Sequence, residues 1–124
     1  MRVYWEDTDA GGVVYHASYL RFMERGRTEL LREKGVDQRV LLAERGLSFV
    51  VASMNIRFRA PARLDDELDV VTILKDLGGA SLVLDQKVVR GDEILVSAEV
   101  ICALIAREGR PSRIPAEIRA KLGG

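Results

Sequence analysis

Hydrophobic residues in the first third of the chain recur at the spacing of an α-helix. Between about residues 17 and 34, charged side chains separate them, so one face is apolar and the other polar. The apolar face consists of Tyr19, Phe22, Met23, Gly26 and Leu30. Gly35 is typical of a helix end. A shorter helix is expected over residues 37–45, with Asp37 as its N-cap and Gly46 as its stop.

The hydrophobic period then changes to two, which indicates strands with one buried face. Four strands are predicted, at about 50–58, 68–77, 80–89 and about 93–106. Gly78-Gly79 joins the second to the third as a pair that can take the positive φ values of a tight hairpin, and Gly91-Asp92 repeats this device. Residues 3–5 are expected to add one more strand, and Pro115 to begin a short terminal helix.

These elements predict an α+β fold in a single domain over residues 1–124. The long helix and the antiparallel sheet each have one apolar face, and a curved sheet wrapped around the central helix buries both. A chain of 124 residues is long enough for one proper core.

The composition of the chain argues against several classes of function. The 19 basic and 19 acidic residues balance, so we expect no binding to nucleic acid. No apolar run approaches the roughly 20 residues that span a bilayer, and Met1 leads into a polar segment, so we expect a cytoplasmic protein without membrane insertion. The lone Cys102 lies in an apolar run and is expected in the core. No metal-ligand pattern is present, and no cofactor is expected.

Candidate chemistry lies in the stretch EDTDAGGVVYHASYL, residues 6–20. It leaves the first predicted strand, turns at Gly11-Gly12 and enters the long helix, whose first N–H groups have no partner in the helix. Such amides, around residues 15–18, can polarise a carbonyl oxygen. Asp9 lies across the glycine corner from them. A carboxylate facing free amides can perform acyl transfer, although Asp9 could also be only a turn residue.

A thioester suits such a site better than an amide or alkyl ester does. An amine or alkoxide leaving group needs a proton from a general acid, whereas a thiol, with a pKa of about 8.5 in cysteine, leaves much more easily. One carboxylate and an oxyanion hole are therefore sufficient.

Two sequence blocks carry a family resemblance. VYWEDTDAGGVVYHASYLRFMERGRTELL and FVVASMNIRFRAPARLDDELDV resemble the hotdog-fold thioesterases of the 4-hydroxybenzoyl-CoA thioesterase type. Within these, the chain is most similar to the acyl-CoA thioesterases associated with the Tol-Pal cluster. The resemblance covers nearly the whole chain. It implies a hotdog fold and hydrolysis of a small or medium acyl-CoA to free acid and thiol.

The same resemblance implies an assembly and a catalytic apparatus. Dimers join their sheets edge to edge, often pair into homotetramers and place the active sites at the subunit interface. Asp9 is the implied catalytic carboxylate, either as nucleophile or as general base on water. The His16 amide is the implied polariser of the thioester carbonyl, and the His16 side chain is expected to help place substrate or water. Relatives commonly carry tyrosine where this chain has Trp5, so no phenolic role transfers to that position.

Substrate binding is assigned to Gly12 and Tyr15 in the corner and to Arg57 and Arg59 in the strand that follows the helices. Arginine suits the phosphates of coenzyme A because its planar fork binds two oxygens at once. Further candidates for the same role are Arg63, Arg107, Arg110 and Arg113. A solvated polar strand face is the alternative for each arginine. Glu24 and Arg27 are spaced for a helical ion pair, and a role in the pocket is the alternative.

Two other functions compete with acyl-CoA hydrolysis. A hotdog dehydratase would carry a histidine beside a proline-rich motif, which this sequence lacks. A non-catalytic hotdog protein could bind acyl groups or act as a scaffold with acyl carrier protein or lipid-synthesis enzymes. Acyl carrier protein is also a possible thiol carrier for the hydrolase.

Overall fold

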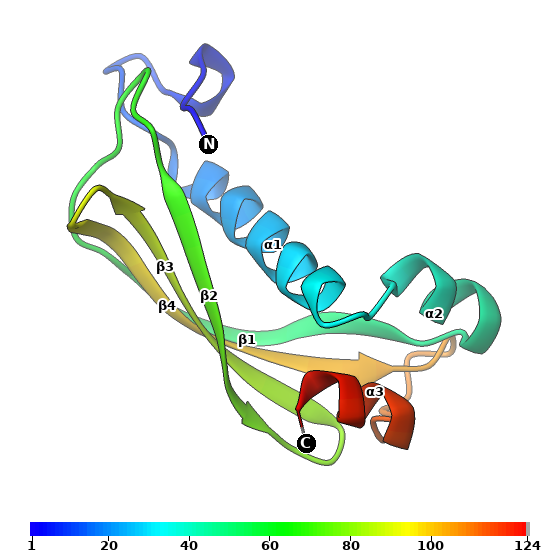
Figure 1. The fold of residues 1–124 in the computed structure, drawn as a ribbon. Helices are drawn as coiled ribbons and strands as arrows, with labels where there is room; N and C mark the ends of the chain where they lie inside the picture. The colour runs from blue at the N-terminus through cyan, green and yellow to red at the C-terminus, as the bar shows by residue number, and fades with distance from the viewer. Residues whose placement is uncertain (124) are drawn as a thin grey trace.

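The computed structural model describes residues 1–123 (Figure 1). Its elements are the 3-10 helix η1 (Trp5–Asp7), the helices α1 (His16–Glu33), α2 (Gln38–Arg45) and α3 (Ala116–Leu122), and the strands β1 (Ser48–Phe58), β2 (Asp69–Leu77), β3 (Ser81–Arg90) and β4 (Glu93–Ile105). No helix in the described part of the chain is long and apolar enough to cross a bilayer.

The four strands form one antiparallel sheet in the order β1-β4-β3-β2. The sheet curves past α1, which packs on β2 and β3 (Figure 1). Residues alternate between buried and more exposed along β3, as expected for a strand with one face on a core. Gly26 lets the helix approach closely, since a Cβ atom there would lie 2.7 Å from Val70 Cγ1 and 2.8 Å from Thr72 Oγ1. The predicted helix-wrapping α+β sheet is confirmed.

Strand β1 differs from the prediction of one buried face. It lies at the edge of the sheet, beyond the strands that α1 covers. Met54 and Ile56 are half-buried, but Val50, Val51 and Phe58 are 37%, 44% and 40% exposed. The alternation was therefore a correct guide to the strand and a wrong guide to its burial within one chain.

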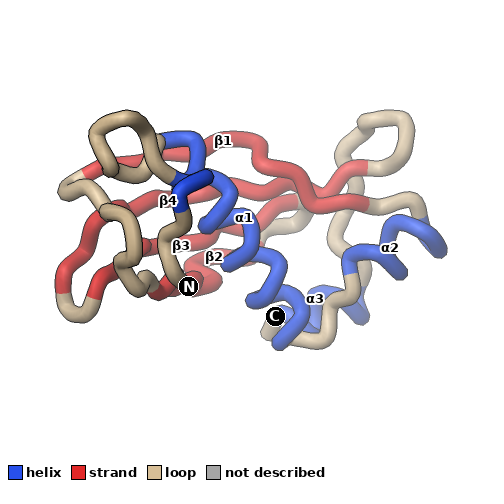
Figure 2. The backbone as a smooth tube through the Cα atoms, turned by 90° about the horizontal axis from the view of Figure 1, so that it is seen from above, coloured by secondary structure: helices blue, strands red, loops and turns tan. Residues whose placement is uncertain are grey.

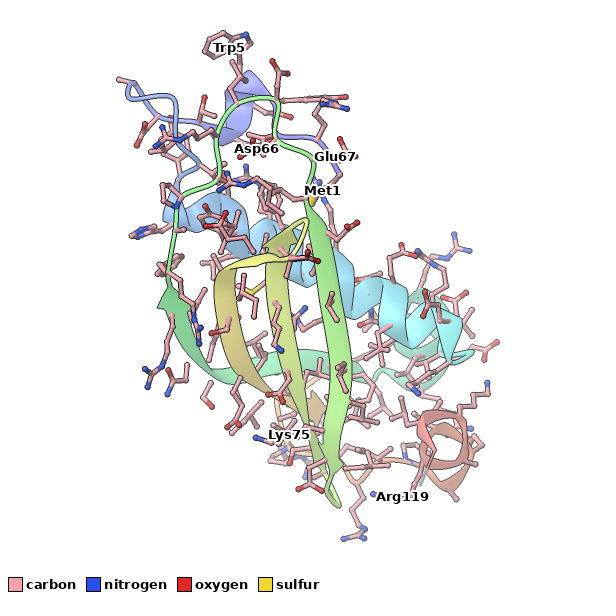
Figure 3. All side chains as sticks on the ribbon, turned by 60° about the vertical axis from the view of Figure 1, so that its left-hand side comes forward. Met1, Trp5, Asp66, Glu67, Lys75 and Arg119 are labelled. Carbon is pink, nitrogen blue, oxygen red and sulfur yellow. The ribbon has the colours of Figure 1, made fainter. Side chains whose placement is uncertain are left out.

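The prediction of a strand over residues 3–5 is wrong. Arg2 forms an isolated bridge with Glu67, and the chain then turns into η1. The turn forms because the Asp7 carboxylate accepts the Tyr4 N–H at 3.0 Å, while Thr8 donates to the Trp5 carbonyl through both its N–H and its hydroxyl. The Met1 amino group donates to the Leu68 carbonyl. Figure 3 shows Met1 beside Glu67, with Trp5 projecting away from the molecule.

The two glycine turns behave differently. Gly91 has the expected positive φ of 59°. Neither Gly78 nor Gly79 has one, which contradicts the expected hairpin geometry. Their lack of a side chain serves close packing instead, because a Cβ at Gly79 would lie 3.2 Å from the Arg113 Nη1 atom, and one at Gly78 would lie 3.2 Å from the Ser81 carbonyl oxygen.

Local signals at the other helix ends are confirmed. The Asp37 carboxylate caps α2 by accepting the Arg39 and Val40 N–H groups, and Gly46 ends that helix in the left-handed region. Pro115 is the N-cap of α3. Figure 2 shows α2 and α3 near the C-terminal end of α1, where Arg45 and Glu117 form an ion pair between them. Cys102 lies in the core as expected, and burial raises the pKa of its thiol.

Candidate active site

The corner that carries Asp9 is a tight turn closed by its own backbone. The Gly12 N–H donates to the Asp9 carbonyl at 3.0 Å, and the Asp9 N–H donates to the Val13 carbonyl at 2.9 Å. Gly12 has a φ of 79°, which side chains disfavour. The corner therefore requires glycine at this position for conformational reasons.

The two oxygens of the Asp9 carboxylate have different surroundings. Oδ1 accepts the Gly11 N–H at 2.8 Å and the Val13 N–H at 3.4 Å, as in a turn stabilised by an aspartate. Oδ2 accepts no hydrogen bond within residues 1–123, and the side chain is half-buried. Asp9 is thus both a turn residue and the bearer of one free carboxylate oxygen.

Helix α1 begins with free amides. Tyr15 is the N-cap, and its N–H donates to the Asp7 carbonyl at 3.1 Å. The Ser18 N–H donates to the Tyr15 carbonyl, but the His16 and Ala17 N–H groups donate to no acceptor in the described chain. Two donors therefore remain at the positive end of an 18-residue helix.

Aromatic contacts position the His16 side chain. Its ring stacks on Phe58 at the end of β1, with ring centroids 4.0 Å apart and planes inclined by 18°. Tyr19 packs against the same phenylalanine and accepts the Ala62 N–H on its hydroxyl at 2.8 Å. Burial raises the pKa of Tyr19, so this residue stays neutral and structural. The sequence pattern does not indicate this contribution of Phe58, because strand alternation assigns the residue only to a core face.

A cavity of about 440 Å³ brings these groups together. Of the residues predicted for the site, it is lined by Asp9, Tyr15, His16 and Arg59. Gly12 belongs to the adjoining turn rather than to the lining. Arg57 lines a separate cavity of about 310 Å³ with residues of β3 and β4. The remaining lining is Val13, Val14, Tyr19, Phe58, Ala60 and Pro61.

Local contacts account for two of the other arginines. Arg107 donates to the Leu42 and Ala43 carbonyls at the end of α2, and Arg110 pairs with Glu108 at 2.8 Å. The expected pair of Glu24 and Arg27 does not form within the described residues. Arg27 donates instead to the Gln86 Oε1 atom at 2.9 Å.

The arrangement can perform acyl transfer. Asp9 and His16 line one cavity, and one Asp9 carboxylate oxygen and the His16 amide have no hydrogen-bond partner among residues 1–123. The free Ala17 amide follows directly in the helix. The amides can stabilise the negative charge that develops on a carbonyl oxygen under attack. The carboxylate can attack that carbonyl or activate a water molecule.

Comparison with known proteins defines the class. The family model of the Thioesterase-like superfamily matches residues 3–122. The chain belongs to this superfamily. A variant of 4-hydroxybenzoyl-CoA thioesterase in complex with 4-hydroxybenzoyl-CoA has the same fold, with a TM-score of 0.90 over 99% of this chain and 95% of the other at 22% identity.

More similar relatives narrow the class. The chain is 46% identical to the acyl-CoA thioester hydrolase YbgC of Escherichia coli O6:H1, over 98% of this chain and 91% of the relative. It is 44% identical to the acyl-CoA thioesterase YbgC of Haemophilus influenzae, over 97% and 89% of the two chains. The crystal structure of a probable thioesterase from Bartonella henselae superposes with a TM-score of 0.89 at 45% identity, over 93% and 95%.

Proposed function

We propose that this protein is an acyl-CoA thioesterase that hydrolyses a small or medium acyl thioester with Asp9 as its catalytic carboxylate. The observation that carries the proposal is that Asp9, with one free carboxylate oxygen, and His16, whose free amide is next to that of Ala17, line the same cavity. The relatives named as acyl-CoA thioesterases support the same substrate class.

The contacts at the cavity suggest a separate role for each group in the proposed reaction. The amides bind the thioester carbonyl oxygen and stabilise the oxyanion, while Asp9 Oδ2 attacks the carbonyl carbon or takes a proton from the attacking water. The thiolate leaves without a dedicated acid. The stacked His16 ring helps place substrate or water, and Arg59 is the cation at the cavity for a coenzyme A phosphate. Arg57 keeps a phosphate role only outside this cavity.

The decisive experiment measures thiol release from a panel of acyl-CoA thioesters by wild type and Asp9→Asn. Asparagine keeps an oxygen to accept the Gly11 and Val13 N–H groups but loses the charge. We expect kcat/KM to fall at least about 100-fold, roughly 2.7 kcal/mol of transition-state stabilisation. Asp37→Asn, which makes the same change at the cap of α2, should keep the wild-type rate. Equal rates for wild type and Asp9→Asn would overturn the assignment.

Isotope labelling separates the two roles left open for Asp9. In a single turnover in ¹⁸O-water, a general base directs the label into the acid product. A nucleophile forms an anhydride, and attack of water on its aspartyl carbonyl leaves the label in Asp9 and unlabelled oxygen in the product. Label found in Asp9 by mass spectrometry therefore identifies the nucleophilic mechanism, whereas label found only in the acid excludes an anhydride that is hydrolysed at its aspartyl carbonyl.

We further propose that the protein works as a homodimer or homotetramer through the β1 edge. A long edge strand that exposes Val50, Val51 and Phe58 invites pairing with a second copy. Phe58 also lines the Asp9 cavity, so pairing at this edge would place the cavity at the subunit interface. Sedimentation at micromolar concentration should give a dimer or tetramer, whereas a monomer would overturn this assembly.

Acyl carrier protein remains a proposed alternative carrier of the substrate. Parallel assays with one acyl group on coenzyme A and on acyl carrier protein measure the preference directly. A protein that binds the acyl carrier without hydrolysis, equally well before and after Asp9→Asn, would be the non-catalytic scaffold instead. We place the activity in the cytoplasm, where acyl-CoA is formed, and cell fractionation tests this location.

A further inference from the structure

Asp7 is a buried carboxylate in the loop that carries Asp9, and the proposed chemistry does not use it. Its side chain is largely removed from solvent, with the residue 8% exposed, and it does not line the Asp9 cavity. Oδ2 accepts the Tyr4 N–H at 3.0 Å and Oδ1 accepts from Arg21 Nη2 at 3.3 Å. Both oxygens are therefore engaged, in contrast to those of Asp9.

The partners of Asp7 are three residues from two segments of the chain, the entry of η1 and the start of α1. Tyr4 belongs to the entry of η1, and the Asp7 carbonyl accepts the N–H of Tyr15, the N-cap of α1. Arg21 lies in the second turn of α1 and also donates to the hydroxyl of Ser18, which is fully buried. Asp7 thus links the turn before Asp9 to the first two turns of the helix that presents the free amides.

The position of this link bears on catalysis. Asp9 follows Asp7 by two residues, and the His16 and Ala17 amides immediately follow the Tyr15 N-cap that Asp7 holds. Between them the chain passes through the glycine corner, whose hydrogen bonds run within residues 9–13 and do not reach the start of α1. Misplacement of a reacting group by about 1 Å can cost up to about 100-fold in rate. A fixed contact on each side of the corner limits that misplacement.

We propose that Asp7 and Arg21 form a positioning pair that holds the Asp9 carboxylate at a fixed distance from the His16 and Ala17 amides. This inference rests on the proposed thioesterase function. Neither residue touches the cavity, so both act through the backbone they connect. The Arg21 side chain is 49% exposed, so it contributes little to the stability of the fold. Its effect should therefore show in the rate more than in the folding equilibrium.

The test is a double-mutant cycle with Asp7→Asn, Arg21→Met and the combined variant. We expect kcat on the best acyl-CoA substrate to fall about tenfold in each single variant, with KM within about twofold of wild type. Because the two side chains act as one unit, the combined variant should be no slower than the slower single variant. Arg21→Lys, which keeps a cation, should recover at least about threefold in kcat over Arg21→Met.

A structural control separates positioning from destabilisation. Asp37→Ala removes a carboxylate that caps α2 away from the cavity. It should lower the melting temperature at least as much as Arg21→Met does, yet leave kcat unchanged. Equal kcat losses in the two variants, independent effects of Asp7→Asn and Arg21→Met, or a change in KM alone would each overturn the positioning role.

A second readout does not depend on turnover. Backbone hydrogen exchange of residues 9–18 should accelerate at least about threefold in Arg21→Met and remain at the wild-type rate in Asp37→Ala. Unchanged exchange in Arg21→Met would overturn the proposal even if the protein hydrolyses no thioester. Conversely, faster exchange together with equal rates in wild type and Asp9→Asn would reject the proposed function and retain the positioning contact.

Discussion

Polar groups around the middle of α1 are hydrogen-bonded, whereas several at its start have no hydrogen-bond partner within residues 1–123. In the middle, fully buried Gln86 donates to the Met23 carbonyl at 2.8 Å and to Thr72 Oγ1 at 2.9 Å, and accepts from Arg27. At the start, the His16 and Ala17 amides and one Asp9 oxygen have no partner among residues 1–123, and Asp9 and His16 line one cavity. Complete pairing stabilises a fold, whereas unpaired groups at an accessible cavity are available to a substrate.

The largest effect should come from Asp9→Ala, which removes the carboxylate near the start of α1. Like Asp9→Asn, it should reduce kcat/KM at least about 100-fold. Unlike asparagine, alanine offers no acceptor to the Gly11 and Val13 N–H groups, so the free energy of unfolding should also fall by about 1 kcal/mol. Thioesterase assays and urea denaturation of both variants check this. Equal stability of the two variants would mean that Oδ1 does not stabilise the corner.

Gln86→Leu should remove the hydrogen bonds around the middle of α1. It leaves the Met23 carbonyl, the Thr72 hydroxyl and the Arg27 guanidinium without their partner. We expect the free energy of unfolding to fall by about 2 kcal/mol, with kcat per folded molecule unchanged. Gln38→Leu, in a half-buried position where the side chain makes no hydrogen bond within residues 1–123, should change stability by less than about 0.5 kcal/mol. A loss of kcat in Gln86→Leu would show that the hydrogen bonds at the middle of α1 affect the site at its start.

Phe58→Leu tests the aromatic contact that positions His16 at the cavity. It removes the ring that stacks on His16 while keeping an apolar side chain. An aromatic pair contributes about 1 kcal/mol, so we expect kcat/KM to fall about fivefold. Phe49→Leu makes the same change at the other end of β1, away from the Asp9 cavity, and should keep the wild-type value. Equal losses in both variants would point to the strand rather than to the stacked ring.

The smallest effect should be a pH dependence at Asp66, in the loop before β2. Burial raises the pKa of this carboxyl, but hydrogen bonds from the Arg63 N–H at 2.8 Å and Arg90 at 2.6 Å bring it below its ordinary value. A lowered folded-state pKa stabilises the protein above the unfolded value of about 3.9, and the gain is lost as pH falls through the folded pKa.

Unfolding measurements on wild type and Asp66→Asn between pH 7 and pH 3 test this expectation. The wild type should be more stable by about 1 kcal/mol near neutrality. The difference should shrink below about pH 4, as Asp66 becomes protonated. A difference that grows on acidification would mean that the hydrogen bonds do not favour the ionised form.

Much of the fold could be predicted because its signals are local. The Asp37 cap, the Gly46 stop and the Gly91 turn each depend on a few neighbouring residues. The helical and alternating periods gave the element order in the same way. The site was predictable in part for a similar reason, since the turn at Asp9 and the start of α1 lie within ten residues of each other.

One failure is local, since residues 3–5 have a strand-like composition but the Asp7 carboxylate accepts the Tyr4 N–H three residues back, and the chain turns into η1. The other failures depend on contacts between distant segments. A Cβ at Gly79 would lie 3.2 Å from Nη1 of Arg113, 34 positions away. Phe58 meets His16 across 42 positions, while neighbouring Arg57 lines another cavity. Sequence spacing carries no information about which segments meet.

The α+β architecture, the glycine corner and the helix start that follows Asp9 could all be predicted from the sequence alone. These features arise from backbone preferences and hydrophobic period, which act over a few residues. Tertiary packing settles that α1 covers β2 and β3 and leaves Val50, Val51 and Phe58 of β1 exposed. Packing also leaves one Asp9 oxygen and the His16 amide unpaired, within residues 1–123, at a shared cavity, because hydrogen-bond partners are assigned only once distant segments have packed.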